Sequence, residues 1–305
     1  MTPLMETMLI LFIMMVIGFA ANKAKFITAN TNNEISNLVV NITTPALIIA
    51  SVLGEETKNI QLNVFYLLLT GIIFYAGMIL FGNLFIRIFP FFKEDGTIYK
   101  FMLIFGNVGY MGYPIFRSLF GESAVFISVL INMPFNILMF SYGVYSFAKA
   151  GGKTSSFHWK NLLSPGLVSA VMALVLYFIP MNVPEFIRSP LASIGNTTVP
   201  LSMILIGFSL GEIEMKNALK DYKTVIISLV KLIAIPTAVF FIAGLFVEDP
   251  KLIELLTINA GLPAASLIVI LATQYKVDLE VSTIGVFVST ILSIVTIPML
   301  EQILF

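Results

Sequence analysis

Long apolar runs, separated by short polar segments, occupy almost the whole chain. About 20 residues of helix span the hydrocarbon core of a bilayer, whereas a transmembrane strand has about 10 residues of alternating polarity. The runs here are long and do not alternate, so we predict ten transmembrane helices in an all-α polytopic membrane protein. The ten runs fall near residues 4–22, 34–53, 63–89, 98–118, 123–148, 163–180, 189–211, 222–247, 252–273 and 280–305.

Composition supports this class of protein. Hydrophobic residues make up 58% of the chain and charged residues 11%, with a mean hydropathy of +0.97. Soluble domains carry about 25% charged residues, so a soluble enzyme, a nucleic-acid binder and a secreted scaffold are excluded. The chain has no cysteine, which excludes a disulfide framework and cysteine-ligated metals. It also has no P-loop and no HExxH motif, so we predict no cofactor, no metal and no catalytic residue.

The basic residues divide unequally between the two sides that alternate loops define. Short loops rich in Lys and Arg remain cytoplasmic, so we predict that both termini lie outside. The opposite side carries Lys58, Arg117, Arg188 and Lys251. The predicted cytoplasmic side carries Lys23, Lys25, Arg87, Lys93, Lys100, Lys149, Lys153, Lys160, Lys216, Lys220, Lys223 and Lys276.

Two pairs of segments recur at nearly one offset. Asn41–Pro45 and Asn196–Pro200 both read Asn-x-x-x-Pro and lie 155 residues apart, and Gly106 lies 157 residues before Pro263. Each copy then contains five helices, and because five is odd, the second copy enters the membrane from the opposite face. We therefore predict an inverted repeat, with a first copy at 1–150, a cytoplasmic linker at 151–161 and a second copy at 162–305.

Helix-breaking residues concentrate in the fourth and ninth runs. Inverted repeats with interrupted helices point to a secondary transporter whose site lies near mid-bilayer. The candidate crossover residues are Gly106, Gly112, Pro114, Gly261 and Pro263. Gly106-Asn107 and Pro114 are alternative breaks in the fourth run, and we favour Gly106-Asn107 because it is central and matches Pro263. The alternative interpretation is that Gly and Pro are simply frequent in membrane helices.

Polar residues near these breaks are the candidates for substrate binding. Asn107 would cap the half-helix that follows it, and the positive ends of the two half-helices would attract an anion. The alternative is that such residues only hold membrane helices together through hydrogen bonds. The full candidate set is Asn107, Asn41, Thr44, Asn196, Ser266 and Tyr110.

Lys231 is the only charged residue deep within a predicted span. It lies about nine residues from the cytoplasmic end, or roughly 13 Å deep. A lysine at mid-bilayer costs at least about 2.5–3.5 kcal/mol, so a partner must compensate it. Two partners are open: the carbonyls at the negative C-terminal end of a broken half-helix, or the carboxylate of the substrate.

The two broken segments resemble the auxin efflux carrier family, which includes plant auxin exporters and bacterial malate and malonate carriers. Residues 106–121, "GNVGYMGYPIFRSLFG", resemble its Asn-x-x-x-Met-Gly-x-Pro segment, and residues 261–290 resemble its Leu-Pro segment and the helix that follows. The resemblance implies scaffold helices 1, 2, 6 and 7, and a transport domain of helices 3–5 and 8–10 in which 4 and 9 cross. It also implies that Asn107 lies at a carboxylate-binding crossing.

Two departures from the plant members stand out. The plant proteins have a proline where this chain has Gly106, and a long central loop where this chain has a short linker. The short form resembles bacterial members, which makes auxin itself a poor candidate for the physiological substrate.

Together these features predict a secondary carrier of a small organic anion, working by alternating access in the bacterial cytoplasmic membrane. The class of anion is a carboxylate, auxin-like or dicarboxylate. Two alternatives use the same architecture without coupled transport, namely an anion channel and a membrane solute sensor. An intramembrane enzyme is a third alternative. The partners are the anion and the lipid bilayer, with no nucleic acid, and both a monomer and a homodimer stay open.

The predicted orientation can be tested by cysteine labelling, because the native chain has no cysteine. Single cysteines at Asn59 and Lys153 would lie on opposite sides of the membrane. We expect an impermeant maleimide added to intact cells to label position 59 and to leave position 153 unlabelled. The reverse pattern would overturn the orientation derived from the charges.

Overall fold

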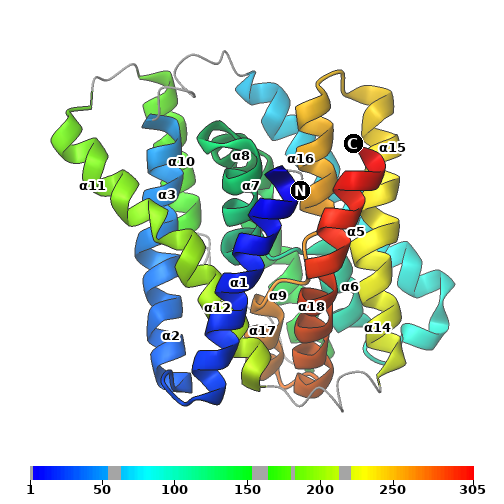
Figure 1. The fold of residues 1–305 in the computed structure, drawn as a ribbon. Helices are drawn as coiled ribbons and strands as arrows, with labels where there is room; N and C mark the ends of the chain where they lie inside the picture. The colour runs from blue at the N-terminus through cyan, green and yellow to red at the C-terminus, as the bar shows by residue number, and fades with distance from the viewer. Residues whose placement is uncertain (1–2, 54–62, 153–163, 180–182, 213–220) are drawn as a thin grey trace. The chain divides into compact units, whose positions relative to one another are not determined.

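The computed structural model describes residues 3–53, 63–152, 164–179, 183–212 and 221–305. Asn59, Lys153 and most of the predicted linker at 151–161 lie outside the described residues. Each of the ten predicted apolar runs is mostly helical where it is described, and no β-strand occurs among these residues (Figure 1). The all-α class predicted from the sequence is thus confirmed, while the ten membrane crossings and the inverted repeat stay predictions.

Several of the predicted runs contain more than one helical segment. The single-segment runs are α1 (Pro3–Lys23), α5 (Val64–Ile88), α10 (Pro165–Phe178) and α18 (Leu279–Leu304). The composite runs are α2 (Ala29–Leu38), η1 (Val39–Thr43) and α3 (Thr44–Leu53); α6 (Gly96–Ile104), η3 (Val108–Gly112) and α7 (Tyr113–Phe120); α8 (Glu122–Leu138), η4 (Met139–Gly143) and α9 (Val144–Ala150); α11 (Glu185–Asn196) and α12 (Thr198–Glu212); α14 (Tyr222–Leu229), η6 (Val230–Ala234) and α15 (Ile235–Phe246); and α16 (Pro250–Ala260) and α17 (Leu267–Tyr275). A short 3₁₀ turn, η2 (Pro90–Phe92), precedes α6.

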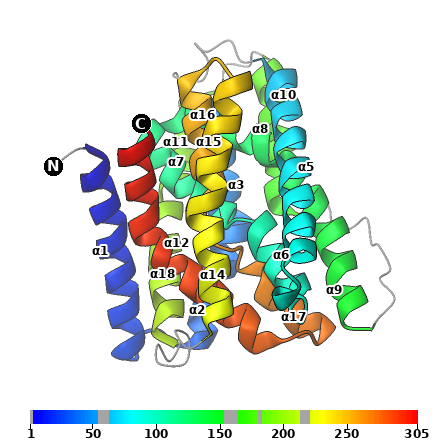
Figure 2. The ribbon, with the colours of Figure 1, turned by 90° about the vertical axis from the view of Figure 1, so that its right-hand side faces the viewer.

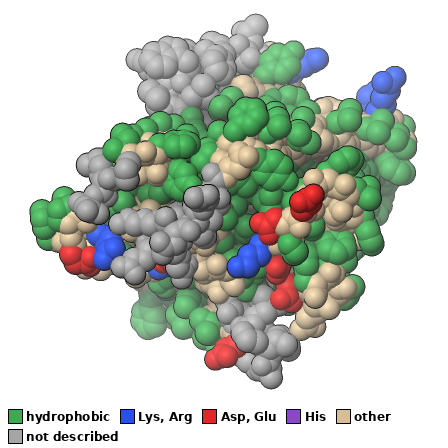
Figure 3. Space-filling view, turned by 90° about the horizontal axis from the view of Figure 1, so that it is seen from above, with side chains coloured by type: hydrophobic (Ala, Val, Ile, Leu, Met, Phe, Trp, Pro, Cys, Tyr) green, Lys and Arg blue, Asp and Glu red, His purple; other side chains and the backbone are tan. Residues whose placement is uncertain are grey.

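Five stretches of continuous helix are long and apolar enough to cross a membrane, counted over the described residues. They are Ala29–Leu53, Val64–Ile88, Glu185–Glu212, Tyr222–Phe246 and Leu279–Leu304. Large hydrophobic side chains are exposed on several helices, for example Phe65 at 75% and Leu245 at 78%. Hydrophobic side chains also cover much of the face seen from above, with charged groups scattered among them (Figure 3). Such surfaces suit a lipid environment and are rare on soluble proteins.

The chain packs as two compact units. Unit 1 contains residues 1–72, 109–136 and 159–212, and unit 2 contains residues 73–108, 137–158 and 213–305. Both units draw residues from both predicted repeats. The division into repeats at 1–150 and 162–305 therefore stays a prediction.

In unit 1, α1 runs alongside α12 (Figure 1). Two glycines allow this close approach. A Cβ at Gly207 would lie 1.9 Å from the carbonyl oxygen of Met15, and one at Gly18 would lie 2.1 Å from that of Ile204. The side chain of Lys23 at the end of α1 donates to the carbonyl of Gly211 at 2.6 Å. Small residues that let backbones meet are typical of membrane helix pairs.

The segments that carry the two Asn-x-x-x-Pro motifs also meet in unit 1. Helix α3 packs against α11, and η1 contacts both α11 and α12. A Cβ at Gly195 would lie 2.8 Å from the Cα of Leu47. The absence of a side chain at Gly195 therefore lets the end of α11 lie directly against the start of α3.

Unit 2 is built around α18 and α14 with its continuation α15. Helix α18 packs against α14, α15 and α17, and α15 packs against α16 (Figure 2). Helix α6 contacts α14, α18 and η6. Near the start of α14, Lys223 forms an ion pair with Glu94 at 3.6 Å.

Single turns of π-helix interrupt several long helices. Asn41 lies in η1 and Lys231 in η6. Such turns are often found at functional sites in α-helices. Four of the residues chosen from the sequence therefore occupy such turns, since Tyr110 and Gly112 lie in the π-helical segment η3.

The α1–α12 contact predicts a stability difference between two glycines. Gly207→Ala places a methyl group against the Met15 carbonyl and should destabilise the protein by roughly 1–3 kcal/mol or more. Gly244→Ala is the matched control, because a Cβ at Gly244 meets no atom within 4 Å. Thermal unfolding in detergent would measure both. Equal melting temperatures for the two variants would contradict this packing of α1 on α12.

Candidate functional site

The fourth and ninth runs are both interrupted, and the interruptions meet within unit 2. Helix α6 ends at Ile104 and η3 begins at Val108, while α16 ends at Ala260 and α17 begins at Leu267. Gly106 and Ala264 form an isolated antiparallel β-bridge.

Main-chain hydrogen bonds join the two interrupted segments directly. The amide of Asn107 donates to the carbonyl of Pro263 at 2.8 Å, and the amide of Ala265 donates to the carbonyl of Phe105 at 3.0 Å. These main-chain bonds therefore tie the two breaks together.

The structure decides between the two breaks that the sequence allowed in the fourth run, at Gly106-Asn107 or at Pro114. Residues 105–107 are non-helical, whereas Gly112 lies in η3 and Pro114 lies in the first turn of α7. Gly106-Asn107 is thus the interruption, whereas Pro114 lies within the continuous helical backbone of 108–120.

Glycine is required at the crossing because the two backbones are so close. A Cβ at Gly106 would lie 3.0 Å from the Cβ of Leu262 and 3.5 Å from the carbonyl oxygen of Asn259. Gly261 caps the end of α16, and a Cβ there would lie 3.3 Å from the side chain of Leu300. Larger residues at Gly106 would force the two segments apart.

Each break leaves a backbone group that a side chain from a neighbouring helix satisfies. In a continuous helix the Leu103 carbonyl would accept from the Asn107 amide, but that amide bonds to Pro263. The Nζ of Lys231 donates to the Leu103 carbonyl instead, at 3.2 Å. On the other side, the amide of Ala264 donates to the Oγ of Ser289 in α18 at 3.1 Å.

Lys231 and Ser289 are both fully enclosed. Lys231 is 1% exposed and Ser289 is 0% exposed. Two partners for Lys231 were open from the sequence, the carbonyls at the end of a broken half-helix or the carboxylate of the substrate. The contact with Leu103 is of the first kind, because Leu103 lies at the C-terminal end of α6.

Several of the amides that follow the two breaks already donate hydrogen bonds within the protein, so fewer of them can bind an anion than we predicted from the sequence. The amide of Val108 donates to the Gly106 carbonyl, and those of Ala264 and Ala265 donate to Ser289 and Phe105. The amides of Ser266 and Leu267, which open α17, take part in none of the hydrogen bonds found among the described residues. The Ser266 side chain does not cap α17. Asn107, 7% exposed, lies at the same crossing.

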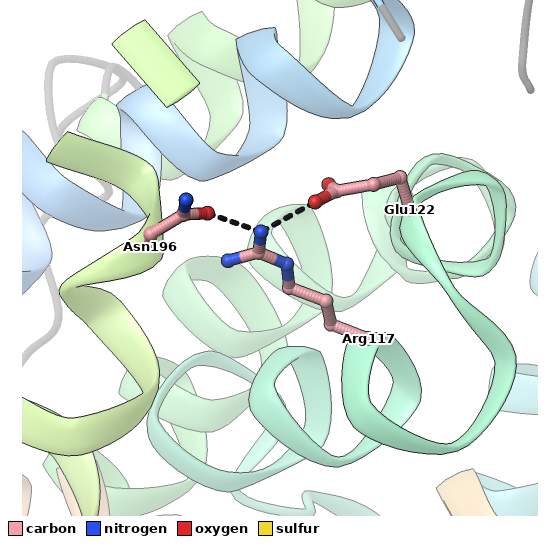
Figure 4. Close-up of polar contacts among 3 residues, drawn as sticks. All are labelled: Arg117, Glu122 and Asn196. Atoms are coloured by element: carbon pink, nitrogen blue, oxygen red, sulfur yellow. Dashed lines mark hydrogen bonds and ion pairs between the residues drawn. The ribbon is translucent and has the colours of Figure 1, made fainter. Parts of the chain in front are cut away.

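A second group of candidate residues lies in unit 1. Arg117 of α7 donates both to the Oδ1 of Asn196, at the end of α11, and to a carboxylate oxygen of Glu122 (Figure 4). The side chain of Arg117 is 20% exposed. A guanidinium is thus held at the interruption between α11 and α12, where Asn196 was predicted to line the site.

The remaining candidates in unit 1 are held by local bonds. Asn41 is exposed and donates to the carbonyl of Asn37 at 2.8 Å, and Thr44 is buried at the start of α3. The hydroxyl of Tyr110 lies 2.5 Å from the Oγ of Ser36. Asn41, Thr44, Asn196 and Tyr110 thus belong to unit 1, whereas Asn107 and Ser266 belong to unit 2.

Two residues of interest were not chosen from the sequence. Arg117 lies within the apolar fourth run, near its end, and a cation in such a run is itself a signal of a functional role. Ser289 gave no signal, because one serine in an apolar helix has no distinguishing pattern.

A Gly-x-Ser-x-Gly sequence at residues 207–211 has a structural explanation. The motif of serine hydrolases requires a strand–turn–helix context, but here it lies within continuous α12. The Oγ of Ser209 donates to the Leu205 carbonyl of its own helix, and Gly207 and Gly211 pack against α1. The described residues also contain no group of three or more His, Cys, Asp or Glu that could hold a metal.

Comparison with known proteins agrees with these features. A family described as membrane transport protein matches residues 3–300. The "Uncharacterized transporter MJ1031" of Methanocaldococcus jannaschii is 24% identical over 303 residues, 96% of each chain. An "Uncharacterized transporter" of Methanothermobacter thermautotrophicus is 22% identical over 98% of each chain, and the "Uncharacterized transporter YfdV" of Escherichia coli is 19% identical over 95% of this chain and 94% of its own.

The chain therefore belongs to the membrane transport protein family, and its resemblance to auxin efflux carriers is confirmed. As a member, it is a multi-pass membrane protein that acts on a transported small molecule.

The hydrogen bond from the Ala264 amide to Ser289 predicts that two buried serines of α18 differ in how much stability is lost when each is replaced by alanine. Ser289→Ala removes the acceptor for the Ala264 amide and should cost roughly 1–3 kcal/mol. Ser282→Ala is the matched control, because Ser282 is also 0% exposed but donates only to the Asp278 carbonyl of its own helix. Thermal unfolding should show the larger loss for Ser289→Ala, and equal losses would contradict a role for Ser289 at the break.

Proposed function

We propose that this protein is a secondary carrier that moves a small organic anion by alternating access. The substrate class is a carboxylate, and the crossing of the two interrupted helices is its binding centre. The observation that carries the proposal is the backbone contact of Gly106-Asn107 with Pro263-Ala264 within unit 2. Interrupted helices that meet are the feature on which many secondary transporters build their sites.

The chemistry at the crossing favours a negatively charged substrate. The two amides that open α17, Ser266 and Leu267, present the positive end of a helix dipole. Asn107 offers an amide side chain that can donate to a carboxylate oxygen. Lys231 adds a positive charge at the carbonyl of Leu103. Leu103 lies four residues, about one helical turn, before Asn107 in the sequence. No described carboxylate pairs with this lysine.

Unit 1 by itself also holds polar residues that suit an anion. Arg117 is a cation with five donors, which matches carboxylates in geometry, and it is held by Asn196 and Glu122. Asn41, Thr44 and Tyr110 add neutral donors and acceptors. In the proposed arrangement helices 1, 2, 6 and 7 form a scaffold, and helices 3–5 and 8–10 move as the transport domain. The protein would lie in the bacterial cytoplasmic membrane with both termini outside.

Asn107→Ala tests the binding centre. Loss of one hydrogen bond to a charged partner should weaken substrate affinity roughly 10- to 150-fold without preventing folding. Asn83→Ala, an exposed asparagine of α5 in the same unit, should leave the affinity unchanged. Substrate would first be found by thermal shift against malonate, malate and aromatic carboxylates. An Asn107→Ala protein with unchanged affinity would remove Asn107 from the site.

Counter-flow separates a carrier from a channel. We expect proteoliposomes preloaded with the identified anion to take up labelled anion faster than empty ones, because a carrier exchanges substrate across the membrane. Uptake that does not saturate and is not accelerated by preloading would favour a channel. Binding without uptake in either assay would favour a solute sensor.

A further inference from the structure

Lys231 occupies an unusual position for a positively charged side chain. It lies in η6 and is 1% exposed. One hydrogen bond is described for its ammonium, the bond to the Leu103 carbonyl. An ammonium has three N–H donors, so two of them are left without a partner in the described residues.

No described carboxylate on the elements packed against η6 forms an ion pair with Lys231. These elements are α14, α15, α18 and α6, and α15 has no ionisable residue. The charged residues on the others are Lys223 on α14, Glu280 and Glu301 on α18, and Lys100 on α6, with Tyr222 and Tyr99 as the remaining titratable groups. Among the described residues, Lys223 pairs with Glu94 and none of these groups pairs with Lys231.

The carbonyl that Lys231 contacts is freed by the helix break itself. The Asn107 amide, which would bond to Leu103 in a continuous helix, bonds to Pro263. The Val108 amide likewise bonds to Gly106 instead of Ile104. The C-terminal end of α6 therefore presents carbonyl oxygens and a negative dipole end inside the protein.

Carbonyls of this kind are sodium ligands in other transporters. Where helices are broken at mid-membrane, unwound carbonyls and half-helix C-terminal ends coordinate the coupling cation. Here an ammonium that is covalently part of the chain reaches the same type of oxygen. Sodium and the lysine ammonium are both monovalent cations that bind carbonyl oxygens. When the ammonium lies at the Leu103 carbonyl, a sodium ion cannot occupy the same position.

We propose that the Lys231 ammonium is a built-in cation that occupies, at the end of α6, the position a coupling sodium ion would otherwise take. The broken half-helix is then stabilised without any dissolved cation. For transport, which rests on the proposed function, the consequence is that anion movement requires no sodium.

Removing the ammonium in two ways tests the proposal on the full-length protein without any substrate. Lys231→Ala removes the charge and opens space at the Leu103 carbonyl, so a small dissolved cation can replace the ammonium. Lys231→Met removes the charge but fills the space with an apolar chain of similar length. Melting temperatures would be measured in NaCl, choline chloride and methylammonium chloride at equal ionic strength.

We expect the parent to melt at the same temperature in all three salts. In choline chloride both variants should melt lower by roughly 2–12 °C, because a buried carbonyl has lost its donor. Sodium or methylammonium should restore at least half of the loss in Lys231→Ala and none of it in Lys231→Met. If Lys231→Ala is not recovered in choline chloride, the yield of monodisperse protein in NaCl and in choline chloride gives the same comparison.

Three results would overturn the proposal. The first is a parent that sodium stabilises relative to choline. The second is a Lys231→Ala protein that neither sodium nor methylammonium restores. The third is a Lys231→Met protein that melts at the same temperature as the parent in choline chloride, which would show that the end of α6 needs no ammonium. Because the melting experiment contains no substrate, a failure of the proposed transport activity would leave its outcome unaffected.

Discussion

The structure depends on how other protein groups satisfy the backbone amides and carbonyls that the two helix breaks leave free. In hydrocarbon, each unsatisfied amide or carbonyl costs several kcal/mol, so irregular backbone survives only against protein or a water-filled cavity. In unit 2 the two breaks bond to each other through Asn107, Pro263, Phe105 and Ala265. A membrane protein can thus keep two interrupted helices if each supplies the partners that the other lacks.

Side chains complete what the two backbones leave open. Lys231 donates to the Leu103 carbonyl, and Ser289 accepts from the Ala264 amide. The two side chains differ in cost. A serine brings no charge into the interior, whereas an ammonium brings one at a cost of at least about 2.5–3.5 kcal/mol. A carbonyl could be satisfied by a neutral donor, so the presence of a lysine suggests that the charge itself has a use.

The charged and polar groups of unit 1 follow a different pattern. Arg117 is held by Asn196 and Glu122, and Tyr110 by Ser36. These are side-chain contacts between helices, which can be exchanged for contacts with a substrate at little cost to the backbone. The crossing in unit 2 is fixed by main-chain bonds and cannot be exchanged in this way.

The sequence by itself determined the class of protein and the mainly helical character of the ten runs, and in the fourth run it favoured the break at Gly106-Asn107 over Pro114. These features follow from local composition, because apolar length sets a span and Gly or Pro at its centre interrupts it. The sequence also indicated that Lys231 needs a partner, since burial of a charge is costly wherever it occurs. Only the tertiary structure decided that the partner is Leu103, that Ser289 serves the second break, and that Arg117 reaches Asn196. Those contacts join residues 128, 25 and 79 positions apart, and the pairing of distant residues depends on how helices pack, which no local pattern encodes.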